Sequence, residues 1–254
     1  MTHVSYSEIK LWHECPHKHK LQYVDKIDGF KGNLHTAFGT AIHSVCERGL
    51  LDENLDREKH FLEAFANELA SLEEKEVEID MSLHDQMMGQ YKPIVSSFRE
   101  GLDEYFGDCE VISTEEKLYE DMEGHGMKFK GFIDLVVRTP DGKYHILDWK
   151  TTSWGWNARR KSDKILNYQL TLYKVFWAKK HNIPLENIET HFGLLKRTAK
   201  KNNTEIFRVT SGQKKVRNAM AFLDKAVLNI KRKFTIKNRL SCRYCAFYKT
   251  QHCT

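Results

Sequence analysis

The sequence has few residues that interrupt regular structure and no long apolar run. Four prolines and 14 glycines among 254 residues leave little room for a flexible linker. No uncharged stretch approaches the roughly 20 apolar residues that a membrane-spanning helix needs. The N-terminus, MTHVSYSEIKLWHECP, lacks the apolar core of a signal peptide. We therefore expect a cytoplasmic protein whose residues 1–254 form a single domain.

Six cysteines are present, although the cytoplasm disfavours disulfides. Cys242, Cys245 and Cys253 form a C-x2-C-x7-C pattern near the C-terminus, while Cys15 lies near the N-terminus. A CxxC pair close to a third cysteine indicates a metal site rather than a disulfide. Judged by spacing alone, zinc is the expected metal, with Cys15 or His252 as the fourth ligand.

Charge is distributed unevenly along the chain. Residues 52–123 contain 22 acidic and six basic side chains, whereas residues 196–243 contain 15 basic and two acidic ones. A basic C-terminal part indicates a polyanionic partner, of which nucleic acid is the first candidate. Two complementary solvated faces of one fold would give the same pattern.

Residues 1–109 have mostly helical periodicity. Gly39 and Thr40 precede AIHSVCERGLL, which predicts a helix that begins with Thr40 as its N-cap. Further helices are expected over residues 5–15, 57–78 and 83–106.

Residues 110–210 have the pattern of a sheet, and residues 211–254 that of a basic helix followed by a cysteine-bearing tail. Strands are predicted over residues 110–119, 128–138, 143–150, 191–197 and 204–209. Helices are predicted over residues 162–181 and 212–233. This order predicts an α/β fold with a central mixed sheet flanked by helices.

Two strand segments contain the residues with the clearest chemical meaning. FKGFIDLVV contains Asp134, and ILDWKTT contains Asp148 and Lys150. Residues two apart on a strand face the same way, so Asp148 and Lys150 share a face and Trp149 lies on the other. Buried acids need a partner, and oxygen ligands suit Mg²⁺ or Mn²⁺, which can activate water against a phosphodiester.

The loop between these strands decides whether the two aspartates meet. If Arg138 pairs with Lys143 across a regular TPDG hairpin, Asp134 faces Leu147 on the wrong side of the sheet. An odd-length loop or a β-bulge would instead bring Asp134 and Asp148 together.

These motifs resemble the PD-(D/E)XK nuclease superfamily, in particular its RecB-like branch. The branch has a G-x-x-D strand, a (D/E)-x-K strand, a following Q-x-x-x-Y helix and an upstream G-x-x-x-H helix. The matching segments are Gly131–Asp134, Asp148–Lys150, Gln169–Tyr173 and Gly39–His43. The resemblance implies a restriction-endonuclease-like core.

The resemblance also implies roles for individual residues. The divalent metal would be held by His43, Asp134, Asp148 and the carbonyl of Trp149. Lys150 would activate the attacking water and stabilise the developing phosphorane, with Gln169 and Tyr173 completing the catalytic set. The branch has a further glutamate on the preceding strand, for which Glu115 and Glu116 both qualify.

The cysteine pattern extends the resemblance to AddB-type nucleases and the CRISPR-associated nuclease of spacer acquisition. Those proteins use one cysteine before the core and three after it to bind a [4Fe–4S] cluster. The resemblance therefore implies that Cys15, Cys242, Cys245 and Cys253 bind such a cluster, with zinc as the alternative.

A basic aromatic segment follows Lys150 and predicts contacts with DNA. Trp154 and Trp156 suit stacking on unpaired bases, and Arg159, Arg160 and Lys161 suit binding of phosphates. We expect a DNA exonuclease acting at ends or on single strands in recombination, repair or replication. The alternatives are an endonuclease of restriction or CRISPR-adaptation type and a non-catalytic iron–sulfur DNA-binding subunit.

The sequence has no G-x-x-x-x-G-K-[ST] phosphate loop. A helicase or recombination motor would therefore be a separate partner chain. The sequence leaves the oligomeric state open, and an oligomer is compatible with it.

Overall fold

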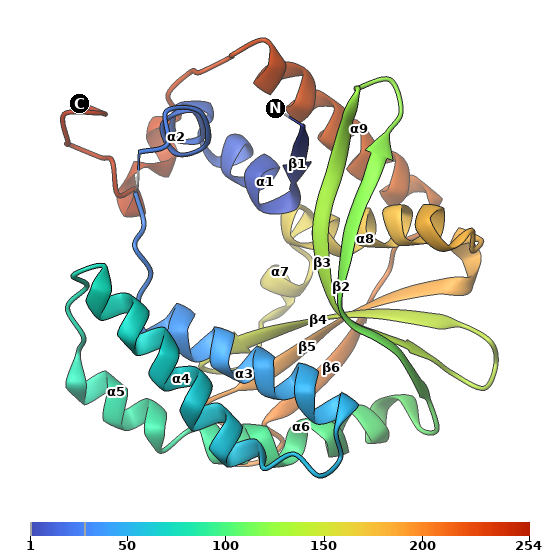
Figure 1. Cartoon of the computed structure of the whole chain (residues 1–254). Helices are drawn as coiled ribbons and strands as arrows, with labels where there is room; N and C mark the ends of the chain where they lie inside the picture. Colours follow the sequence, from blue (N-terminus) through green and yellow to red (C-terminus); the bar gives the residue numbers. More distant parts are fainter. Residues whose placement is uncertain (1, 28) are drawn as a thin grey trace.

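The computed structural model describes residues 2–27 and 29–254, which fold around a six-stranded mixed sheet (Figure 1). The hydrogen-bonded order is β1–β3–β4–β5–β6. The strand β2 lies off this path and pairs with β3 along the length of that strand. The β1–β3 and β4–β5 pairs are parallel, and the other pairs are antiparallel. The strands are β1 (His3–Ser5), β2 (Glu110–Met122), β3 (Met127–Arg138), β4 (Tyr144–Thr152), β5 (Ile188–Lys196) and β6 (Thr204–Val209).

Helices cover both faces of this sheet (Figure 1). One face packs through Leu147 and Trp149 against α3, α4 and α6, and the other packs through Ile146 and Phe192 against α1, α8 and α9. The predicted α/β class with a central mixed sheet is confirmed. The helices are α1 (Tyr6–Glu14), α2 (Pro16–His19), α3 (Leu34–Leu51), α4 (Arg57–Glu74), α5 (Met81–Met88), α6 (Tyr91–Phe106), α7 (Ala158–Lys161), α8 (Lys164–His181) and α9 (Gln213–Lys231).

No helix within residues 2–27 and 29–254 is both long and apolar enough to cross a membrane.

The helix that carries His43 begins earlier than the sequence pattern predicts. Asn33 is the N-cap of α3: its side chain accepts a hydrogen bond from the N–H of Thr36 at 3.0 Å, and Thr36 Oγ1 accepts one from the N–H of Asn33 at 2.9 Å. The predicted Thr40 cap is wrong, because Leu34 and Phe38 are buried in the core and extend the helix by two turns.

Other expectations also differ from the structure. The strand predicted over residues 191–197 begins three residues earlier, at Ile188. The helix predicted over residues 83–106 is two helices, α5 and α6, because the chain turns at Gly89, the C-cap of α5. Lys143 lies in the loop before β4 rather than in the strand. The elements β1 and α7 are too short for a periodic pattern to reveal them.

The hairpin between β3 and β4 brings the two aspartates together. Arg138 pairs with Tyr144, so the loop has an odd number of residues, 139–143. The same register pairs Leu135 with Leu147, and one step further along it Asp134 comes beside Asp148. Of the two registers considered for this hairpin, the structure has the one that a shared site requires.

Candidate active site

Asp134 of β3 and Asp148 of β4 form the centre of the site. Asp148 is 2% exposed, and its Oδ2 lies 2.5 Å from Lys150 Nζ. Asp134 Oδ2 accepts a hydrogen bond of 2.7 Å from the backbone N–H of Trp149. The Trp149 ring is buried on the opposite face of β4, as strand alternation predicts. The structure thus brings Asp134, Asp148 and Lys150 together.

Helix α8 supports this centre from one side. Gln169 Nε2 donates hydrogen bonds to Asp148 Oδ1 at 2.7 Å and to the Tyr173 hydroxyl oxygen at 3.2 Å. The Tyr173 ring approaches β3 at Gly131, where an added Cβ would lie 2.7 Å from a ring carbon. The glycine of the G-x-x-D motif therefore makes room for the tyrosine of the Q-x-x-x-Y motif.

His43 approaches the centre from α3. Its Nδ1 lies 3.6 Å from Asp134 Oδ2. Burial, followed by repulsion from Lys150, lowers the pKa of His43 to about 4. The imidazole is therefore neutral at neutral pH, which is the form that ligates a metal.

Glu116 lies away from the two aspartates. Its carboxylate accepts hydrogen bonds from Lys180 Nζ at 2.7 Å, His181 Nε2 at 2.6 Å and Trp177 Nε1 at 2.9 Å. Although burial opposes the change, these hydrogen bonds lower the pKa of Glu116 to about 2. Its contacts tie β2 to α8.

Glu115 of β2 lies opposite Asp134 on the neighbouring strand β3. The flanking pairs Thr114–Leu135 and Glu116–Ile133 fix this register. Its backbone has a left-handed φ of 46°. Burial, and then the charges of Glu47 and Asp148, raise the pKa of Glu115. Of the two glutamates that the sequence leaves open, Glu115 is the one whose electrostatics are coupled to the aspartates.

The centre holds more negative charge than its cation balances. Burial raises the pKa of Asp134 well above its ordinary value, with Asp148 and Glu115 adding to the rise, and burial also raises that of Asp148. Lys150 opposes both shifts. In the described part of the chain, the buried Asp148 Oδ2 has no hydrogen-bond partner besides its ion pair. Clustered acidic oxygens with a neutral imidazole fit a divalent cation.

Two residues near the centre carry no motif that singles them out. Glu47 lies four residues after His43 on α3, so helical spacing is a signal that could have found it. Tyr6 of α1 donates a hydrogen bond of 2.5 Å to the carbonyl of Ile165. Tyr6 lines one cavity together with Tyr173, although no sequence signal marks it, and burial, and then the charge of Asp148, raise its pKa.

The predicted DNA-contact segment is divided between surface and core. Trp154 is 73% exposed, whereas Trp156 is 8% exposed and lies beneath the Arg160 guanidinium, 4.8 Å from its ring centre. Arg159 is exposed, and Lys161 Nζ lies 2.6 Å from Glu205 Oε1. Of the two tryptophans, Trp154 is the one that presents its ring to solvent.

A groove lined by basic and aromatic side chains begins beside the centre at Tyr173. The Lys130 ammonium on its wall lies 5.9 Å from the ring centre of Phe132, which is 43% exposed. Its basic and aromatic lining residues are His3, Tyr6, Tyr23, Lys26, Lys130, Phe132, Tyr173, Lys231 and Lys233.

The structure also brings Cys15, Cys242, Cys245 and Cys253 to the lining of one cavity. Within residues 2–27 and 29–254 all of them are free thiols. The C-terminal segment lies beside α2 (Figure 1), and the backbone N–H of Asn238 donates a hydrogen bond of 3.3 Å to Cys15 Sγ. Two ends of the chain therefore meet at these four sulfurs.

Comparison with known proteins gives one family. The model of the PD-(D/E)XK nuclease superfamily matches residues 3–250. A search of curated proteins finds no match.

Comparison with solved structures gives the same kind of fold. The crystal structure of a "Putative exonuclease" from Eubacterium rectale has a TM-score of 0.60 at 13% identity, covering 96% of this chain and 85% of that chain. The match to the crystal structure of SSO0001 covers 84% of this chain and 91% of that chain at 14% identity, with a TM-score of 0.39.

Proposed function

Because the chain belongs to the PD-(D/E)XK nuclease superfamily and is therefore a nuclease, we propose that it is a Mg²⁺- or Mn²⁺-dependent DNA exonuclease. The observation that carries the proposal is the position of Asp134 beside Asp148, with Lys150 at 2.5 Å from the second carboxylate. Two carboxylates can hold a divalent metal that activates water, and a lysine beside them can stabilise the charge that develops on a phosphodiester.

The residues present fit a divalent metal. His43, Asp134, Asp148 and the carbonyl of Trp149 would hold it, with Glu115 as a further candidate. Bound there, it would lower the pKa of water and neutralise phosphate charge. Lys150 would stabilise the charge that develops on the phosphate. Gln169 holds the Asp148 carboxylate in place through its 2.7 Å hydrogen bond, and Tyr173 orients Gln169.

The groove at Tyr173 supports a single DNA strand as the substrate. Its ammonium groups suit phosphates, and the exposed Phe132 ring suits stacking on an unpaired base. Trp154, with Arg159, Arg160 and Lys161 nearby in sequence, would bind the strand on another side of the site. The name of the Eubacterium rectale structure favours an exonuclease over an endonuclease.

End-labelled DNA distinguishes the candidate activities. With Mn²⁺, the exonuclease should degrade linear single strands from an end and leave a closed circle intact. Cleavage of the circle would identify an endonuclease of restriction or CRISPR-adaptation type. Binding without any cleavage would indicate a non-catalytic subunit. A helicase partner and an oligomer are compatible with each outcome, since the motor would be a separate chain.

We also propose that the four cysteines hold a [4Fe–4S] cluster rather than zinc. The four thiols line one cavity and come from both ends of the chain. Four cysteine thiolates are the usual ligand set of such a cluster, and a tetrahedral zinc is the alternative.

The two adjacent glutamates of β2 give a matched pair of variants. Glu115→Gln should lower cleavage and raise the Mn²⁺ concentration needed for half-maximal rate, because it removes a carboxylate coupled to Asp134 and Asp148. Glu116→Gln should leave both values near wild type and lower the melting temperature, because it weakens the contacts with α8. Equal effects of the two substitutions on Mn²⁺ dependence would remove Glu115 from the site.

His43→Ala should weaken metal affinity more than DNA affinity. The imidazole would be one nitrogen among oxygen ligands, a set that favours Mn²⁺ over Mg²⁺. Titration of activity with each metal measures the change, and the preference for Mn²⁺ should shrink in the variant. An unchanged half-saturation point would make His43 a packing residue.

A further inference from the structure

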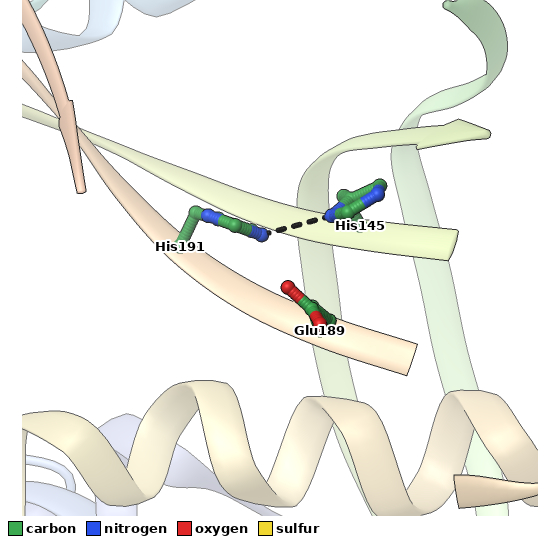
Figure 2. A group of neighbouring side chains, drawn as sticks. All are labelled: His145, Glu189 and His191. Atoms are coloured by element: carbon green, nitrogen blue, oxygen red, sulfur yellow. Dashed lines mark hydrogen bonds between the residues drawn. The ribbon is translucent and has the colours of Figure 1, made fainter. Parts of the chain in front are cut away.

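A second cluster of metal-binding side chains lies at the opposite face of the sheet. His145 of β4 pairs in register with Glu189 of β5, and His191 follows on the same face of β5. Their three side chains converge (Figure 2), with all donor atoms within 4.8 Å of one another. His145 is three residues before Asp148, so the two side chains project to opposite faces of β4. The cluster is therefore separate from the nuclease centre.

The two histidine rings point their nitrogens at each other. His145 Nδ1 and His191 Nε2 are 3.0 Å apart (Figure 2). A tetrahedral zinc with Zn–N bonds of about 2.0–2.1 Å holds its nitrogens about 3.3–3.4 Å apart. An ion could thus replace the proton between the rings with a small movement of each side chain.

The remaining ring nitrogens are held by hydroxyl groups. Thr139 Oγ1 donates to Asp141, so the Nε2–H of His145 must donate to Thr139, at 2.9 Å. This tautomer leaves His145 Nδ1 without a proton and free to bind a metal. His191 Nδ1 lies 3.3 Å from the Tyr105 hydroxyl, which can accept its N–H once Nε2 is a ligand. Such outer contacts orient ligating histidines in metal sites.

Burial favours the uncharged form of both rings. It lowers the pKa of His145, and, with the help of His145 and Arg208, it lowers that of His191 to about 3. The uncharged imidazole is the form that ligates a metal.

Two cations hold one oxygen of Glu189. Its Oε1 lies 3.0 Å from Arg208 Nη2 and 3.3 Å from Lys143 Nζ. Both basic side chains are about half exposed, so solvent screens their repulsion of an incoming ion. Within residues 2–27 and 29–254, no ion pair or hydrogen bond involves Oε2, which leaves that oxygen for a metal.

We propose that His145, His191 and Glu189 form a zinc-class metal site that fastens the start of β4 to β5, on the face of the sheet opposite the nuclease centre. Two imidazoles and one carboxylate suit a borderline transition ion such as Zn²⁺ and disfavour Mg²⁺ and Ca²⁺. A water would take the fourth position, from the surface hollow lined by Tyr105, Phe106 and Arg208. The ion would stabilise the strand pair that carries Asp148 and Lys150.

Histidine-ring NMR of the full chain titrated with Zn²⁺ resolves this site from the cysteines and the nuclease centre. The ring signals of His145 and His191, assigned from His145→Gln and His191→Gln, should shift together along one saturable binding curve, and Mg²⁺ should not move them. Loss of one ligand should weaken this binding at least about ten-fold, since even outer-contact changes cost about 10–100-fold. Arg208→Gln should tighten it several-fold by removing a like charge.

His181→Gln is the matched control, because His181 also contacts a glutamate, Glu116, but lies outside the cluster. It should leave the Zn²⁺ titration of His145 and His191 unchanged. The wild-type measurement decides the matter even if a variant fails to fold. Should Zn²⁺ saturate the other sites while the rings of His145 and His191 keep their metal-free signals, the cluster is a hydrogen-bonded network and the proposal is wrong.

Discussion

Replacing Lys150 with alanine should reduce DNA cleavage by about 10²–10³-fold or more, the loss seen when a preorganised charge-stabilising donor is removed. Asp134→Ala and Asp148→Ala should be at least as severe, because each removes a proposed metal ligand. DNA binding should remain, since in the proposed function the groove and Trp154, and not these three residues, would contribute the contacts with the strand. Single-turnover cleavage with Mn²⁺, alongside a binding titration in Ca²⁺, separates the two effects.

Lys128→Ala is the control for loss of a lysine. Lys128 Nζ lies 2.9 Å from the exposed Asp121, far along β3 from the aspartates, and its removal should leave the rate unchanged. Thermal unfolding of each variant shows whether the fold survives, because Lys150→Ala leaves the buried Asp148 without its ion pair. A folded Lys150→Ala variant that cleaves DNA at the wild-type rate would mean that the lysine has another role.

The second large effect is expected at the cysteines. Serine at Cys15, Cys242, Cys245 or Cys253 should remove the iron and its visible absorbance. It should also lower the free energy of unfolding by well more than the roughly 0.5 kcal/mol of an ordinary surface change, because a metal bound by an unformed site contributes folding free energy. The melting temperature should fall accordingly. The loss is large because the cavity joins Cys15 to a segment more than 220 residues later, where Asn238 Nδ2 donates to the carbonyl of Glu14 at 2.8 Å.

Cys109→Ser supplies the control, since Cys109 is half-buried beside α6 and outside the cavity. It should keep the colour and the metal. Iron, zinc and acid-labile sulfide are measured on protein purified without oxygen. Stoichiometric zinc without iron would make the site a zinc site, and retained metal in Cys15→Ser would exclude the N-terminal ligand.

The motifs predict which of these residues come together because each motif lies in a regular element. Asp134, Asp148 and Lys150 lie on strands whose alternation can be read from the sequence, and Gln169 and Tyr173 share one helix face. The number of residues in the loop between the strands decides whether Asp134 and Asp148 meet. With Lys143 in the loop this number is odd, and with Lys143 in the strand it would be even. The choice between the two registers therefore needed the structure.

Other residues depend on packing that periodicity does not encode. Trp154 and Trp156 have the same local composition, yet one ring is exposed and the other is buried. The choice between Glu115 and Glu116 follows from the pairing of β2 with β3 and from the contacts of α8. The cluster on the opposite face requires the parallel register of β4 and β5, which joins residues 44 positions apart and so brings His145 beside Glu189 and near His191.

Anomalous X-ray diffraction from wild-type crystals soaked in Mn²⁺ tests the central claim most directly. A nuclease centre at these residues predicts a manganese peak in contact with the carboxylates of Asp134 and Asp148 and close to His43, and its absence from crystals of Asp148→Ala. Crystals saturated with Mn²⁺ that show no peak at Asp134 and Asp148, from a preparation that cleaves DNA with Mn²⁺, would place the active site elsewhere.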